Sequence, residues 1–221
     1  MCSWNEDTRL QERRRPFNVE GLIRLAAEAV NRNVDNVVGF SKLAEGGFNR
    51  TFLLTMKDNF QMVARLPYPV SQPKPLLISS EVATMDYLRI QGIPVPKVYG
   101  YCPTAENLAA TEYIFMEFVR GTNLGDIWFE IGEKARLTIV EKLVDLESRL
   151  FSLELPASGS LYYSRDLDIQ SGRIDVQPTS SIPTQRFCIG PDTTLALWYG
   201  KRIDLDVHRG PCEQLLTSDR S

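Results

Sequence analysis

The sequence predicts an α+β fold, in which a small antiparallel sheet and one helix form a domain and a connector leads into a helical segment. Strand-like runs follow one another in the first half of the chain, and a helical spacing of apolar residues occupies 132–155. The order of elements is helix, three strands, helix, two strands and helix. This order is typical of domains in which helices cover an antiparallel sheet.

The composition limits the classes of partner. The 221 residues are 43% hydrophobic and 24% charged, as in ordinary globular proteins. A net charge of −3 gives no general attraction for nucleic acids or anionic membranes, so we expect neither as a partner. No apolar run reaches about 18 residues, and the polar start lacks a secretory signal, so we expect a protein that is not secreted. Four scattered cysteines and a single histidine predict reduced thiols and no metal site.

The first half of the chain is expected to form one helix and a three-stranded meander. Asn18 is a candidate N-cap for a helix whose apolar residues recur at steps of three and four. Strands are predicted at 37–45, 50–56 and 60–66, and the first two are joined by a glycine-containing turn.

The second half begins with a helix that we expect to be capped by Ser79 or Ser80 and closed by Gly92. Two strands and a long amphipathic helix then follow, at 97–101, 111–119 and 132–155. Beyond residue 156, glycine, serine, proline and threonine separate short apolar runs, so an irregular segment is predicted there.

The turn that contains Gly46, Gly47 and Asn49 is the first candidate binding element. Glycines lack the Cβ atoms that keep a backbone away from a phosphate, and exposed N–H groups bind anions. The alternative is a hairpin turn without any ligand.

Arg65 is the second candidate, because it is a cation between apolar neighbours of a strand and therefore needs an anionic partner. Glu81 in the next helix can supply the carboxylate, and the pair would then lie beside the glycine turn, where the phosphates of a nucleotide could bind. A purely structural ion pair is the alternative. A third element is the connector at Glu117, Phe118 and Val119, whose backbone groups could pair with an adenine edge.

These features combine into an order that resembles a known family. The sequence has a glycine turn between two strands, then V-A-R-L-P with Arg65, a helix with Glu81, G-I-P-V-P-K-V-Y-G-Y and M-E-F-V-R-G-T-N-L. This order resembles the N-terminal lobe of the aminoglycoside phosphotransferase family, which has a protein-kinase-like fold. Arg65 occupies the position where this family more often has lysine, and a guanidinium also pairs with phosphate.

The resemblance extends over roughly residues 17–212. The motifs G-S-L-Y-Y, R-F-C-I-G-P, W-Y-G-K-R and D-L-D-x-x-R-G-P are similar to a fungal branch that includes the altered inheritance of mitochondria protein 9 group. It implies ATP as the cofactor and phosphoryl transfer to a small-molecule hydroxyl. The charge pattern predicts a flexible arm at 1–16, and the change in composition predicts a boundary near 156. With these bounds, the resemblance implies a kinase-like N-terminal lobe at 17–121, a connector with the first C-lobe helices at 122–156, and an irregular, incomplete C-lobe segment at 157–221.

The residues for catalysis are missing from this chain. Transfer in this fold needs an aspartate, a nearby asparagine and a second aspartate that holds Mg²⁺, but no asparagine follows Asn123 and His208 has no nearby downstream aspartate. We therefore expect no catalytic residues and no Mg²⁺ site here, with Mg²⁺ bound only in full-length relatives. The chain is expected to be truncated after R-G-P, which would expose the apolar side of the helix at 132–155 to aggregation or to a protein partner.

Two questions stay open. The chain is expected to be an inactive member of a phosphotransferase family, and the alternative is a non-catalytic module that binds a nucleotide or a protein. The resemblance favours mitochondria, but acids interleaved with Arg9 and Arg13 argue against a transit peptide and favour the cytoplasm.

Overall fold

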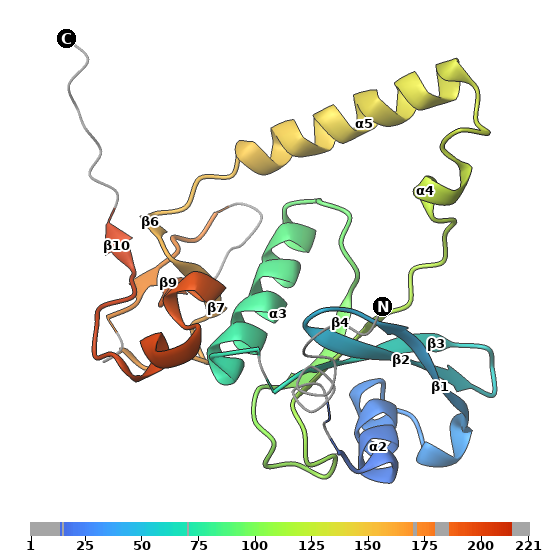
Figure 1. The fold of residues 1–221 in the computed structure, drawn as a ribbon, viewed down its shortest axis with the longest axis horizontal. Helices are drawn as coiled ribbons and strands as arrows, with labels where there is room; N and C mark the ends of the chain where they lie inside the picture. Colours follow the sequence, from blue (N-terminus) through green and yellow to red (C-terminus); the bar gives the residue numbers. More distant parts are fainter. Residues whose placement is uncertain (1–13, 15, 70, 170–171, 180–185, 214–221) are drawn as a thin grey trace, which may run out of the picture.

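The computed structural model describes residues 14, 16–69, 71–169, 172–179 and 186–213 (Figure 1). Almost all of the arm expected at 1–16 and the last eight residues of the chain lie outside the described residues.

A five-stranded antiparallel sheet forms the centre of the first half, with strand order β1-β2-β3-β5-β4. Its strands are β1 (Val37–Glu45), β2 (Asn49–Met56), β3 (Gln61–Pro67), β4 (Val98–Cys102) and β5 (Tyr113–Glu117). The predicted meander is confirmed, and the two later strands extend the same sheet because β5 pairs with β3.

Helix α2 (Val19–Ala29) covers one face of this sheet. The Asn18 side chain accepts a hydrogen bond from the Gly21 N–H at 3.1 Å, which confirms the predicted N-cap. Leu22 and Ala26 are fully buried in a core that they share with buried residues of β2, β3 and β5.

Helix α3 (Lys74–Ile90) covers the opposite face and begins earlier than the sequence predicts. Its N-cap is Pro73, and a proline also occupies the first turn, where the fixed φ of proline suits a helix and its missing N–H is not needed. Ser79 and Ser80 are buried inside the helix, so the prediction that one of them caps it was wrong. Gly92 follows the last turn with φ +77, as the predicted closure requires.

The connector leads through α4 (Leu124–Ile127) into α5 (Glu133–Phe151). Figure 1 shows α5 lying along the outside of the molecule. None of its residues is buried, and the predicted apolar side is exposed at Leu143 and Leu150. The expected exposure of this helix is therefore present.

The segment after residue 156 contains short strands where irregular structure was expected. Strands β7 (Ser160–Tyr163), β9 (Phe187–Gly190) and β8 (Ile174–Asp175) form one antiparallel sheet, and β6 (Ala157–Ser158) pairs with β10 (Cys212–Glu213). Two 3₁₀ turns follow β9, at Leu195–Leu197 and Gly200–Asp204. Strands of two to four residues are too short to give a periodic signal in the sequence.

This C-terminal sheet packs on α3, which therefore lies between two sheets. Val82 and Ala83 of α3 share one buried core with Ile114 of β5 and with Phe187 and Ile189 of β9. The first and last parts of the described chain are thus joined by a single hydrophobic core.

Candidate functional site

Arg65 and Glu81 form the ion pair that the sequence led us to expect. The Nη1 group of Arg65 donates to Oε1 of Glu81, and the two side chains are 32% and 28% exposed. Successive strand residues point to opposite faces, so Arg65 shares the α3 side of the sheet with Val63. Burial raises the pKa of Glu81 above its ordinary value, and the charge and hydrogen bond of Arg65 oppose that shift.

A cavity of about 280 Å³ lies beside this pair. Its polar lining is Asn49, Arg65, Ser71, Gln72, Glu81 and Thr193, and its apolar lining is Phe48, Pro67, Leu77, Ile78, Ile114 and Leu195. The cavity thus brings Arg65 and Glu81 together with the first residue of β2. Thr193 and Leu195 come from the loop after β9, and no feature of the sequence pointed to them.

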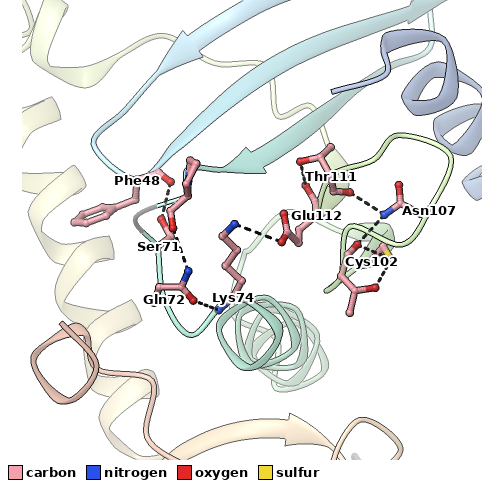
Figure 2. Close-up of polar contacts among 10 residues, drawn as sticks. Phe48, Ser71, Gln72, Lys74, Cys102, Asn107, Thr111 and Glu112 are labelled. Carbon is pink, nitrogen blue, oxygen red and sulfur yellow. Dashed lines mark hydrogen bonds and ion pairs between the residues drawn. The ribbon is translucent and has the colours of Figure 1, made fainter. Parts of the chain in front are cut away.

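The glycine turn is anchored through the backbone of Phe48 (Figure 2). The Phe48 carbonyl accepts hydrogen bonds from the Tyr68 N–H at 2.8 Å and from Oγ of Ser71 at 2.9 Å. Gly46 and Gly47 do not line the cavity, but they directly precede Phe48, which does. A Cβ atom at Gly47 would meet no described atom within 4 Å, so packing among the described residues does not require glycine there.

The stem of the turn is held by Glu45. Its carboxylate accepts hydrogen bonds from Lys42, from the Tyr68 hydroxyl at 2.7 Å and from Nη2 of Arg50 at 2.9 Å. These bonds, that of Lys42 first, lower the pKa of Glu45 to about 2. The end of β1 is therefore fixed by charge-assisted contacts on three sides.

A second ion pair joins α3 to the sheet, between Lys74 and Glu112 (Figure 2). Nζ of Lys74 lies 3.6 Å from Oε1 of Glu112, and the side chains are only 15% and 8% exposed. This pair was not predicted, because no sequence pattern around either residue distinguishes it from an ordinary surface charge. It fixes the first turn of α3 beside the start of β5.

The predicted adenine connector lies further along β5 and does not line the cavity. The Glu117 N–H already donates to the Lys97 carbonyl at 2.8 Å, and the Glu117 carboxylate accepts from the Lys97 N–H at 3.0 Å. Phe118 packs against the core, while Val119 is exposed. The N–H of Glu117 is therefore already engaged by the chain itself.

The described residues also limit the kinds of site that the structure shows. Within the described ranges, no group of three or more His, Cys, Asp or Glu side chains is arranged to hold a metal ion. Cys102, Cys188 and Cys212 are free thiols. In the same part of the chain, no helix combines the length and apolar character that crossing a membrane requires.

Comparison with known proteins identifies similar fungal proteins. No family model matches the chain. It is 38% identical over 174 residues to a subtelomeric hrmA-associated cluster protein of Aspergillus fumigatus, covering 78% of this chain and 32% of that protein. It is 28% identical over 216 residues to altered inheritance of mitochondria protein 9, mitochondrial, of Saccharomyces cerevisiae, covering 87% of this chain and 34% of the yeast protein.

The protein of the same name from Clavispora lusitaniae is 25% identical over 231 residues, covering 86% of this chain and 38% of that relative. The chain spans about a third of the length of the curated relatives it matches. Over most of its own length, it is similar to the fungal altered inheritance of mitochondria protein 9 group, as the sequence motifs indicated.

Proposed function

We propose that this chain binds the phosphate groups of ATP in the cavity beneath the glycine turn, with Arg65 as the phosphate-binding cation. The observation that carries the proposal is the meeting of Arg65, Glu81 and Asn49 in one cavity beside that turn. A guanidinium has five N–H donors, so a bond to Glu81 leaves donors for phosphate oxygens. Glu81 would hold the guanidinium in place rather than contact the nucleotide.

We expect the nucleotide to bind in an extended form, because the cavity is too small to hold all of it. At about 280 Å³, the cavity lies near the lower limit for small-molecule sites, so it would hold only part of ATP. Ile114 lines the cavity, and Glu117 lies about 10 Å further along the same strand. The phosphates would then lie near Arg65 and Gly47, and the adenine near the backbone of Phe118 and Val119.

We further propose that the N-terminal part is a protein-kinase-like lobe of the aminoglycoside phosphotransferase family. The strand order, the cation in β3 and its carboxylate in α3 support this assignment. Longer relatives would transfer a phosphoryl group from ATP to a small-molecule hydroxyl, with Mg²⁺ neutralising the developing charge. This chain has no asparagine after Asn123, so we expect it to bind nucleotide without turnover.

The relatives' names support a mitochondrial location for this chain. The cytoplasm is the alternative, because acidic residues are interleaved with the arginines of its first segment.

Thermal unfolding with increasing ATP and Mg²⁺ tests the proposal. At ATP concentrations 100 times Kd we expect stabilisation of about 2.7 kcal/mol, or roughly 5–10 °C in Tm. Arg65→Ala should abolish this response. Arg32→Ala is the matched control, because Arg32 pairs with Asp58 at 2.6 Å on the surface and does not line the cavity. No stabilisation of the wild-type chain, or an equal response in Arg65→Ala, would contradict the proposal.

A second candidate is a non-catalytic module that binds a protein partner through α5. The exposed apolar side chains of this helix favour it, since a helix with an apolar side usually buries that side. A chain that does not respond to ATP but remains folded would favour this candidate.

A further inference from the structure

The C-terminal sheet packs against α3 on the side of the helix opposite Glu81. Leu76 packs against the small core around Tyr162, and Ala83 and Tyr87 belong to the core that contains Phe187. At about 100° per residue, Leu76, Ala83 and Tyr87 share one side of the helix and Glu81 lies on the other. The rings of Tyr87 and Phe187 meet edge to face with centroids 5.4 Å apart.

A polar contact reinforces this packing near the end of α3. The Tyr163 hydroxyl donates to Oδ2 of Asp86 at 2.7 Å, and Nη2 of Arg186 donates to the same oxygen at 2.5 Å. The Arg186 guanidinium also lies over the Tyr163 ring, 5.3 Å from its centroid. Asp86 follows Glu81 by five residues, or about 7.5 Å along the helix axis.

We propose that the sheet β7-β9-β8 positions the Arg65–Glu81 pair by restraining α3, with Tyr163 and Arg186 as the positioning residues. Glu81 is half-buried, and its ionised form would gain hydration if α3 moved outward. The helix is kept in place by contacts on both sides, through Glu81 to the central sheet and through Asp86 to the C-terminal sheet. The consequence for ATP affinity rests on the proposed function, whereas the restraint of α3 does not.

Two tyrosines of the same strand provide a matched comparison. Tyr163→Phe removes the bond to Asp86 and keeps the ring in the core. Tyr162→Phe removes a bond of similar length, from the Tyr162 hydroxyl to the Pro191 carbonyl at 2.6 Å, that lies wholly within the C-terminal segment. Arg186→Gln is a second variant of the Asp86 contact, in case Tyr163→Phe reduces folding.

Hydrogen exchange of the α3 amides and the Kd for ATP are the two readouts. We expect Tyr163→Phe to speed exchange around Glu81 and to raise Kd, each by about tenfold, and Tyr162→Phe to change neither. In a Glu81→Gln background, Tyr163→Phe should raise Kd little further, because the residue through which it acts has gone.

Equal effects of the two tyrosine variants on α3 exchange would overturn the proposal. So would a faster exchange in Tyr163→Phe with an unchanged Kd, if Glu81→Gln itself raises Kd. If the wild-type chain binds no ATP, the proposed function fails, and the exchange comparison alone decides whether the sheet restrains α3.

Discussion

The hydroxyl of Tyr68 donates a hydrogen bond to Oε1 of Glu45 at 2.7 Å, and this joins the residue after β3 to the last residue of β1. Tyr68 is 2% exposed, and its buried ring holds the hydroxyl in place for this hydrogen bond. Since its N–H also donates to the Phe48 carbonyl, Tyr68 holds both the stem and the end of the glycine turn.

Glu45→Gln should remove an acid-dependent part of the stability. The pKa of Glu45 is lowered from 4.5 to about 2 in the folded chain, so its contribution is present above pH 4.5 and is lost as pH falls towards 2. The difference in unfolding free energy between wild type and Glu45→Gln should be largest at neutral pH and should decrease as the pH falls from 4.5 through about 2. Urea denaturation across this range measures it. Glu154→Gln, at an exposed position outside the network, should give no such trend.

Gly47→Ala should separate stability from ligand binding. The added Cβ meets no described atom within 4 Å, so the unfolding free energy should stay unchanged or rise by up to about 1 kcal/mol. If the turn approaches a phosphate, the same Cβ should weaken ATP binding by roughly tenfold, about 1.4 kcal/mol. Calorimetric titration measures the affinity. Gly132→Ala, at an equally open position before α5, should leave Kd unchanged, and an unchanged Kd in Gly47→Ala would argue against phosphate at the turn.

Phe187→Ala should destabilise the whole described core. Phe187 is 1% exposed and packs in one core with Val82 and Ile114, so we expect a loss of about 3–5 kcal/mol in a single transition. Urea unfolding followed by both tryptophan fluorescence and circular dichroism tests this. Phe151→Ala is the control, since Phe151 is 86% exposed and its loss should cost under about 0.5 kcal/mol. Two separate transitions would show that the C-terminal sheet unfolds on its own.

Replacing Leu143 and Leu150 by glutamine should improve solubility without loss of stability. These residues are 53% and 45% exposed, so the change in unfolding free energy should stay within about 0.5 kcal/mol. Sedimentation velocity should show less self-association than in the wild-type chain, because the exposed apolar side of α5 has been reduced. A large fall in Tm would mean that these residues pack against another part of the molecule.

Local patterns predicted the elements that extend over several turns or many strand residues. Helix α2 and the three meander strands were predicted in place, because Asn18 is a strong N-cap and the strand runs are seven to nine residues long. The start of α3 was predicted wrongly. Proline is compatible with the first turn of a helix as well as with a loop, so Pro73 gave no decisive signal.

At the candidate site, one ion pair was predicted from the sequence and another was not. Arg65 and Glu81 were predicted to pair because a cation between apolar strand residues requires an anion nearby. Lys74 and Glu112 were missed, since their burial depends on how α3 approaches β5 and not on their neighbours in the chain.

The amino-acid order by itself determined the α+β class, the central strands and the pairing of Arg65 with Glu81, because these depend on side-chain periodicity and on charges within short segments. Only the tertiary structure decided that the C-terminal segment folds into a sheet against α3, and that Thr193 and Leu195 line the cavity with Arg65. The physical reason is that strands of two to four residues gain their stability from burial against a distant helix, and such burial leaves almost no local pattern.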